Sequence, residues 1–295
     1  MLYFTLVYTF NRFGWQGSIP AIDEVKYKKM AFRLQNSYRN NFYHTQIHAA
    51  DVVQNLVFLI ERCDVKELCK MTPNDIFFTL ISGAAHDMDH PGTNNMYEIK
   101  CKSKLATLYN DQAVLENHHA ASFFFLLENE ELNCIRNMSP KELADGRKII
   151  VENILGTDMT KHGAIQAEIK AIADLPSEQR EIDGKNKAYL MKALVHAADI
   201  GNPTRPFEIA KKWAENIVRE FFDQGDKEKA QGLEISMLCD RHTTNFAKSQ
   251  IGFLNFVISP YFNILTTIIP KMEDLTKEIT ANVEIYKTLV DEYED

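Results

Sequence analysis

Fold and chemistry can both be argued from one stretch, Gly83-Ala84-Ala85-His86-Asp87-Met88-Asp89-His90-Pro91-Gly92. Upstream of it, Thr72 and Pro73 are typical of a helix start, as N-cap and first helical residue. Apolar residues then recur at helical spacing as far as Ala84, which predicts a helix buried on one side. The His-Asp-x-Asp-His group therefore follows the C-terminal end of a buried helix, and the Pro-Gly pair stops it.

Imidazole beside carboxylate suits a borderline divalent ion such as zinc, and the carboxylate can also bridge to a harder ion. A His-Asp pair alone is weak evidence, because the dipeptide is common and the helix dipole also favours a C-terminal histidine. The metal interpretation therefore depends on the rest of the sequence.

Composition and charge limit the classes of protein that need considering. The 295 residues are 45% hydrophobic and 25% charged, an ordinary globular composition that can bury a sizeable core as one large domain or two small ones. The formal net charge of −8 argues against a nucleic-acid binder with a basic surface. An anionic substrate would need bound cations to reverse the local potential.

Cysteine usage and hydropathy suggest a cellular compartment. Five scattered cysteines without a CxxC pair indicate a reducing compartment and no disulfide framework: Cys63, Cys69, Cys101, Cys134 and Cys239. The apolar residues 1–10 are too short to span a bilayer and lack a basic leader, so we expect them to pack on the domain or on an upstream region. No other run approaches a membrane span, and the sequence predicts a cytoplasmic protein.

Helical periodicity runs through almost the whole chain, and no convincing strand pattern occurs. We expect helices over 20–40, 43–60, 72–85, 109–127, 139–156, 188–198, 207–222, 242–262 and 271–295, with a short one within 93–108. Residues 174–187 and 224–240 are expected to be loops, and the acidic C-terminal helix a solvated face. The prediction is an all-α fold, one domain over 1–295 with its motifs in 43–253.

Histidines and carboxylates gather at the predicted helix ends. His44 and His48 are four residues apart and share a helical face; alone they would be an ordinary surface pair. With His86, Asp87 and Asp199, His48 would give two imidazoles and two carboxylates from three helices. Open positions for water would distinguish such a site from a closed structural zinc. The alternative is a hydrogen-bond network in a helical core, but four such motifs at helix ends argue against it.

Six motifs occur in an order that resembles a known family. They are Tyr43-His44-x-x-x-His48-Ala49-x-Asp51, His86-Asp87-x-Asp89-His90-Pro91-Gly92, Leu115-Glu116-Asn117-His118-His119, Thr157-Asp158-Met159, His196-Ala197-Ala198-Asp199 and Ser249-Gln250-x-Gly252-Phe253. Together they resemble the catalytic domain of the class I 3′,5′-cyclic nucleotide phosphodiesterases, which are HD-type metal-dependent phosphohydrolases, and most of all the cyclic-AMP-specific branch. Each motif alone is weak, whereas six in order are highly specific.

The resemblance implies a compact helical domain around a deep pocket with two metal ions. Zinc would be held by His48, His86, Asp87 and Asp199. A second ion, magnesium or manganese, would touch the protein directly only through Asp87, which would bridge the two. Waters on that second ion would be held by His90, Glu116 and Thr157.

The same resemblance implies the roles of the remaining pocket residues. A water activated by both ions would attack phosphorus, and His44 would be the general acid that protonates the O3′ leaving group. Substrate-binding residues would be Tyr43, Asn202, Gln250 and Phe253, with Gln250 on the purine edge and Phe253 on its face. Ordinary core packing is the alternative for Phe253, and capping of the turn before Pro203 the alternative for Asn202.

Substrate preference is predicted from Asn202 and from residues 232–236, which resemble the cyclic-AMP-specific branch; we expect cyclic AMP to be favoured over cyclic GMP. Two positions depart from the family pattern: Thr45 stands where Asn is common, and Met237 where Pro is usual. Competing hypotheses are another HD-type phosphohydrolase acting on nucleotide monoesters, and a degenerate domain that binds a nucleotide to regulate a partner. The sequence leaves open a regulatory domain outside this chain and a homodimer.

Overall fold

The structure is a computed structural model that describes residues 1–293. Within that range there are helices and no β-strands, which confirms the predicted fold class. The α-helices are α1 (Leu2–Arg12), α2 (Trp15–Ser18), α3 (Glu24–Gln35), α4 (Gln46–Arg62), α5 (Val65–Leu68), α6 (Pro73–Ala85), α7 (Asn95–Lys100), α8 (Lys104–Leu108), α9 (Val114–Glu128), α10 (Pro140–Leu155), α11 (His162–Ala173), α12 (Gly184–Asp199), α13 (Phe207–Ala230), α14 (Phe246–Phe253), α15 (Ser259–Ile268) and α16 (Glu273–Thr288). Shorter turns of 3₁₀ helix are η1 (Met159–Lys161), η2 (Ser177–Gln179), η3 (Asn202–Thr204), η5 (Pro270–Met272) and η6 (Asp291–Tyr293), and η4 (Leu254–Ile258) is a π-helical turn.

Helix α6 forms the centre of the core. It begins as predicted, because Thr72 and Asp75 cap each other's backbone and Pro73 occupies the first turn. Every residue from Ile76 to Ala85 is buried, and the helix packs against α4, α9, α10 and α12. At Gly83 a Cβ would lie 2.6 Å from Leu56 Cδ1, so glycine permits the close approach of α6 to α4.

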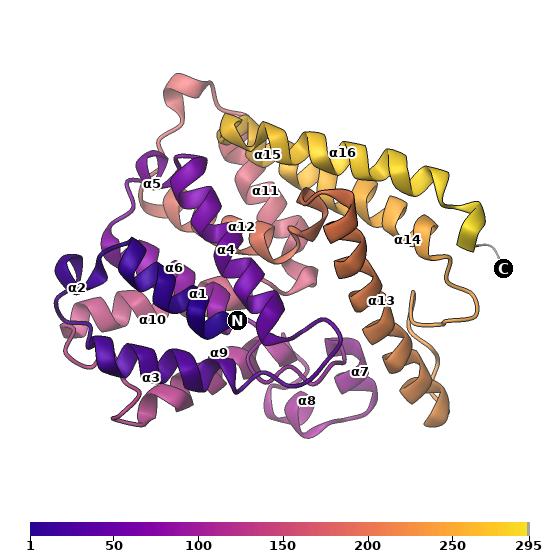
Figure 1. Cartoon of the computed structure of the whole chain (residues 1–295), viewed down its shortest axis with the longest axis horizontal. Coiled ribbons are helices and arrows are strands. Elements are labelled where there is room, and N and C mark those ends of the chain that lie inside the picture. Colours follow the sequence, from indigo (N-terminus) through magenta and orange to yellow (C-terminus); the bar gives the residue numbers. More distant parts are fainter. Residues whose placement is uncertain (294–295) are drawn as a thin grey trace.

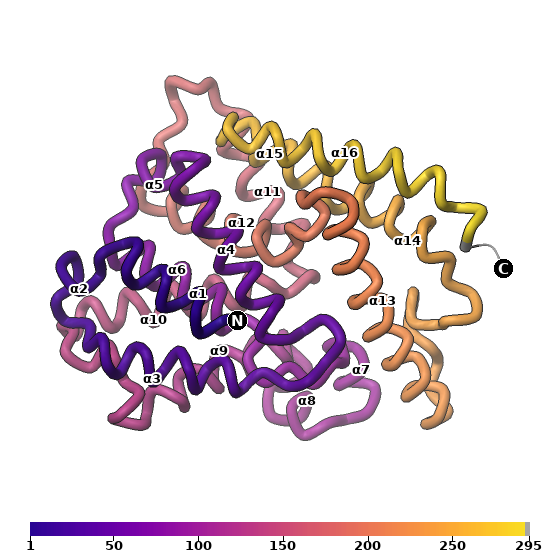
Figure 2. The backbone as a smooth tube through the Cα atoms, viewed as in Figure 1, coloured from indigo at the N-terminus to yellow at the C-terminus, as the bar shows by residue number. Residues whose placement is uncertain are grey.

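The site lies between the central helices and the C-terminal helices. In Figure 1, α4 and α12 lie near the middle of the molecule, with α1, α3 and α6 on one side and α13, α14 and α16 on the other. Figure 2 shows the same separation by colour, with the indigo N-terminal helices opposite the orange and yellow C-terminal ones. A cavity of about 440 Å³ lies among the C-terminal ends of α6 and α12, the start of α9, and helices α13, α14 and α16.

Several boundaries differ from those expected: α12 begins at Gly184, inside the expected loop, and α11 was not among the expected helices. Residues 224–230 are the last turns of α13 instead of a loop, because Gln224, Gly225 and Glu228 lie on its buried face. Helix α14 begins at Phe246, after Asn245 as N-cap, and not at His242. Helix α9 begins at Val114, so residues 109–113 precede it as turns.

The two ends of the chain pack on the core. Residues 2–12 form α1, whose Leu2, Leu6 and Phe10 are buried, so the apolar N-terminal stretch packs on the domain. Helix α16 is more than the solvated face that its charge suggested, because it buries Ile279 and Val283.

One stretch passes the length and composition test for a membrane span. Phe246–Ile268 covers 23 residues and has a mean hydropathy of 1.4, so the expectation that no other run approaches a membrane span was wrong by this test. In the fold it runs through α14, η4 and α15. Leu254, Ile258, Tyr261 and Leu265 are buried in the core, whereas Phe256 is exposed, and 33% of the most apolar window is buried.

Candidate functional site

Four side chains from the ends of three helices converge beside the cavity, and two of them, Asp87 and Asp199, line it. His48 lies in the first turn of α4, which Thr45 caps by accepting a hydrogen bond from the Ile47 amide. His86 and Asp87 directly follow α6, and Asp199 is the last residue of α12. Their ligand atoms lie within 4.8 Å of one another. The structure thus brings together the four residues predicted to hold zinc; their role as ligands stays a prediction.

The distances and proton positions in this cluster fit a bound cation. Asp199 Oδ1 lies 3.0 Å from His48 Nε2 and 3.1 Å from His86 Nε2, and the two Nε2 atoms are 3.3 Å apart. Ligands around a tetrahedral zinc ion with bonds of about 2.0–2.1 Å are separated by about 3.3 Å. His86 Nδ1 lies 2.8 Å from the Gly83 carbonyl, to which it donates, so a neutral ring directs a bare Nε2 into the cluster.

Asp87 completes the cluster. Its Oδ2 is buried, lies 2.9 Å from His86 Nε2, and accepts no hydrogen bond from the described residues. Burial lowers the pKa of His86, but the carboxylates of Asp87 and Asp199 raise it well above the usual range. A cation would replace the proton that these carboxylates stabilise on the imidazole, so metal binding should compete with protonation.

His44 stands beside the cluster and is held by a residue that the sequence did not reveal. Its Nδ1 makes a short contact with Glu220 Oε1, and its amide donates to Glu220 Oε2 at 3.2 Å. The Tyr43 amide donates to the same oxygen at 2.9 Å. Glu220, on α13, is 5% exposed. Thr45, the departure from the family pattern, is therefore not what holds His44.

Glu220 had one sequence signal that could have identified it. Ala210, Ala214 and Val218 form the buried stripe of α13, and the polar Glu220 and Gln224 continue the buried face of the helix. A carboxylate close to such a stripe needs a partner, because burying an unpaired charge is costly. The partner, His44, lies 176 residues away in sequence.

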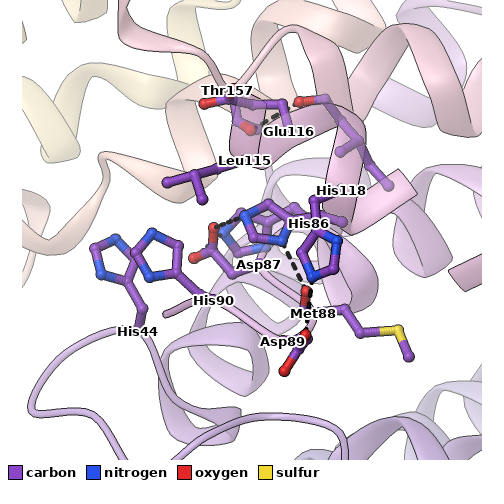
Figure 3. Close-up of polar contacts among 12 residues, drawn as sticks. His44, His86, Asp87, Met88, Asp89, His90, Leu115, Glu116, His118 and Thr157 are labelled. Atoms are coloured by element: carbon purple, nitrogen blue, oxygen red, sulfur yellow. Dashed lines mark hydrogen bonds and ion pairs between the residues drawn. The ribbon is translucent and has the colours of Figure 1, made fainter. Parts of the chain in front are cut away.

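His90 packs on His44 at the cavity wall. Their rings are 3.8 Å apart at 13°, and Figure 3 shows them side by side. The Gly92 amide donates to His90 Nδ1 at 3.0 Å, which leaves Nε2 as the protonated nitrogen of the neutral ring. Asp87, His44 and His90 also form a group that could hold an ion. The stacked rings of His44 and His90 direct their lone pairs into parallel planes, so we do not assign both histidines as ligands of one ion.

Glu116 and Thr157 face each other on the far side of the cluster, as Figure 3 shows. Both line the cavity. Burial raises the pKa of Glu116 to about 7, and the carboxylates of Asp158 and Asp87 act in the same direction. Asn95 donates to its oxygens at 2.9 and 3.2 Å. Positive charge nearby would stabilise the ionised form of this carboxylate.

The residues predicted to bind substrate all line the same cavity: Tyr43, Asn202, Gln250 and Phe253. Gln250 is buried on α14, and its Nε2 lies 3.5 Å from the Ser249 hydroxyl. The Tyr43 hydroxyl donates to Asn202 Oδ1. Asn202 is therefore more than a local turn cap, because it bonds to side chains from another part of the chain.

The contacts of Asp89, His118 and His119 around the metal cluster were not predicted from the sequence. The Asp89 carboxylate accepts from Arg39 Nε at 2.7 Å and from His118 Nε2 at 2.8 Å. The backbone of Asp89 is in the left-handed region, with a φ of 62°, and its side chain is held by these two partners. His119 donates from Nδ1 to the Met88 carbonyl at 2.7 Å, which directs its Nε2 towards Asp87 Oδ1 at 3.8 Å. These contacts hold the turn between His86 and His90.

The fold and the cluster define an all-α protein with a candidate metal centre open to a cavity, and the comparisons specify the class further. Residues 43–279 match the family described as 3′5′-cyclic nucleotide phosphodiesterase. A probable 3′,5′-cyclic-AMP phosphodiesterase of Caenorhabditis elegans is 36% identical over 89% of this chain and 40% of its own length. A 3′,5′-cyclic-AMP phosphodiesterase of Rattus norvegicus is 34% identical over 92% of this chain and 51% of its own.

A comparison with solved structures gives the same class of protein. The phosphodiesterase domain of a rhodopsin fusion protein from the choanoflagellate Salpingoeca rosetta superposes with a TM-score of 0.89 at 28% identity, covering 99% of this chain and 92% of that one. The chain belongs to the 3′,5′-cyclic nucleotide phosphodiesterase family. It spans about half, or less, of the length of these curated relatives.

Proposed function

We propose that this chain hydrolyses the 3′ phosphoester bond of a 3′,5′-cyclic nucleotide to the nucleoside 5′-monophosphate and so ends a cyclic nucleotide signal. The observation that carries the proposal is that the carboxylates of the histidine–carboxylate cluster and the His44–Glu220 pair line one cavity, which Gln250 and Phe253 also line. Family membership supports the same reaction.

The residues present fit two divalent ions. His48, His86, Asp87 and Asp199 would hold zinc. Asp87 would also touch magnesium or manganese. When bound, the ions would activate a water and neutralise charge on the phosphate, which an acidic protein could not otherwise do. His90, Glu116 and Thr157 would orient waters on the second ion.

The proton donor is the step that the chain's own residues explain best. Glu220 occupies His44 Nδ1, so Nε2 carries the proton that can be transferred to the departing O3′. The same carboxylate stabilises the protonated ring. Its backbone contacts to Tyr43 and His44 fix the direction in which the ring points.

Base recognition is assigned to the opposite wall of the cavity. Gln250 would hydrogen-bond the purine edge, and Phe253 would pack on its face. A Gln amide can serve adenine or guanine by rotating, so Asn202 is proposed as the residue that favours cyclic AMP. We place the protein in the cytoplasm, supported by cysteines that all have free thiols.

Product analysis tests the proposal against its alternatives. Cyclic AMP, cyclic GMP and a nucleoside 5′-monophosphate are each incubated with the protein and divalent metal, and the products are separated. We expect the 5′-monophosphate from the cyclic substrates and no release of phosphate from the monoester. Release of inorganic phosphate would favour a monoesterase, and binding without turnover would favour a regulatory nucleotide-binding domain.

A further inference from the structure

The amide of Asn202 is held from two sides. Its Oδ1 accepts from the Tyr43 hydroxyl, and its Nδ2 donates to Asp51 Oδ2 at 3.2 Å. Asn202 is 7% exposed, and Tyr43 is nearly as buried. An Asn side chain presents an acceptor at one end and donors at the other, so these two contacts decide which end faces which neighbour.

Of the two neighbours of Asn202, Asp51 is the one that fixes the orientation of its amide. An ionised carboxylate only accepts hydrogen bonds, so it must face the NH₂ group of Asn202 and repel the carbonyl. A tyrosine hydroxyl can donate or accept and would adapt to either orientation. The carboxylate itself is held, since its Oδ1 accepts from Arg205 at 2.7 Å and its Oδ2 from Asn55 at 3.3 Å.

The fixed orientation of the Asn202 amide decides which of its ends faces the cavity. Tyr43 and Asn202 line the cavity, whereas Asp51 is outside its lining and accepts from the NH₂ group of Asn202. The carbonyl end of Asn202 is therefore on the side of Tyr43 and the cavity. A carbonyl oxygen has two lone pairs, and the Tyr43 hydroxyl uses one. The other can accept from a ligand.

Purine bases differ at the group that such an acceptor would recognise. Adenine carries a 6-amino donor, and guanine carries a 6-oxo acceptor. We propose that Asp51 is a positioning residue for base specificity: by fixing Asn202 with its carbonyl towards the cavity, it favours a 6-amino over a 6-oxo purine. This inference rests on the proposed function and adds to it a residue outside the cavity.

Replacing the carboxylate by its amide isostere tests the inference. In Asp51→Asn either end of the new amide can face Asn202, so Asn202 can turn. We expect the ratio of kcat/KM for cyclic AMP to kcat/KM for cyclic GMP to fall by about three- to tenfold, the value of one hydrogen bond. Should Asp51→Asn fail to fold, Asp51→Ser serves, because its hydroxyl can also face either end.

Two controls separate this role from a general structural one. Arg205→Gln removes the ion pair but keeps the acceptor-only carboxylate, so the protein should lose stability and keep its preference. In the Asn202→Ala background, Asp51→Asn should change the ratio no further, because Asp51 acts through Asn202. An unchanged ratio in folded Asp51→Asn, or the same fall in both backgrounds, would overturn the inference, as would a wild type without preference for cyclic AMP.

A binding measurement keeps the inference distinct from the proposed reaction. Dissociation constants of adenosine and guanosine 5′-monophosphate report base preference without turnover. If the protein bound the adenine nucleotide more tightly and Asp51→Asn removed that difference, the inference would stand even were no cyclic nucleotide hydrolysed. If hydrolysis occurred but neither ratio responded to Asp51→Asn, the proposed function would stand and this inference would fail.

Discussion

His44 is the proposed general acid, and its ring is held by Glu220 on one side and packs on His90 on the other. Both contacts come from segments distant in sequence. A general acid contributes most when the leaving group is poor, because a stable leaving group departs without a proton. Removing the ring therefore affects different substrates unequally.

We expect His44→Ala to lower cyclic nucleotide hydrolysis by about 10²–10⁴-fold. Activity on an aryl phosphodiester with a p-nitrophenolate leaving group should fall much less. Steady-state rates for both substrates, with metal content measured on the same samples, make the comparison. Equal losses on both substrates with metal retained would assign His44 another role.

The pH dependence should respond to Glu220. Burial lowers the pKa of His44, but the carboxylate of Glu220, with those of Asp87 and Asp199, raises it above the ordinary value. An acid acts while protonated, so activity is present below its pKa and is lost as pH rises through it. Glu220→Gln lowers that pKa, and the basic limb of kcat/KM should move to lower pH.

Glu61→Gln is the matched control, because Glu61 pairs with Arg12 on the outer surface of α4. Its pH profile should coincide with that of the wild type. A basic limb that stayed in place in Glu220→Gln, or moved to higher pH, would contradict the role given to this carboxylate.

At the scale of elements, the site depends on the spacing of α4 and α6, which carry His48 and His86. Gly83 sets that spacing: an added Cβ would lie 2.6 Å from Leu56 Cδ1 and 3.2 Å from Val52 Cγ1. Overpacking a core contact costs about 1–3 kcal/mol. We expect Gly83→Ala to lower the free energy of unfolding and to weaken metal retention.

Gly163 of α11 provides the comparison, because a Cβ there would meet nothing within 4 Å. Alanine at that helical position should be neutral or stabilising by up to about 1 kcal/mol. Denaturant unfolding and metal analysis of both variants decide the question. Equal stability of the two variants would show that α4 and α6 do not depend on glycine for their approach.

Sequence alone correctly predicted α6, the helix that leads into the His86–Asp87 motif, because its signals are local. Thr72, Pro73 and the apolar spacing up to Ala84 lie within one helix and its cap. The predicted end of α13 was wrong because the signals that decide it are not local. Gln224 and Glu228 look like loop residues in sequence but are buried: Gln224 accepts from the Asn94 amide at 2.8 Å, and Glu228 from the Ser236 amide at 2.6 Å.

Across the whole molecule, the sequence was enough to predict the members of the metal cluster. The residues that orient the side chains around it are known only from the fold. Two imidazoles and two carboxylates at helix ends were visible in the sequence. The partners of Glu220 and Arg205 were not, because His44 and Asp51 lie 176 and 154 residues away. No periodicity or spacing encodes such pairings.

We propose that this acidic chain, with a net charge of −8, hydrolyses an anionic substrate through ions held at Asp87. The most direct test measures metal content and cyclic AMP turnover of the wild type and of Asp87→Ala, before and after chelation and metal return. We expect wild-type turnover to vanish on chelation and return with divalent metal, and Asp87→Ala to lack turnover throughout. Near-normal turnover of Asp87→Ala, or a fully active wild type after exhaustive chelation, would contradict the account.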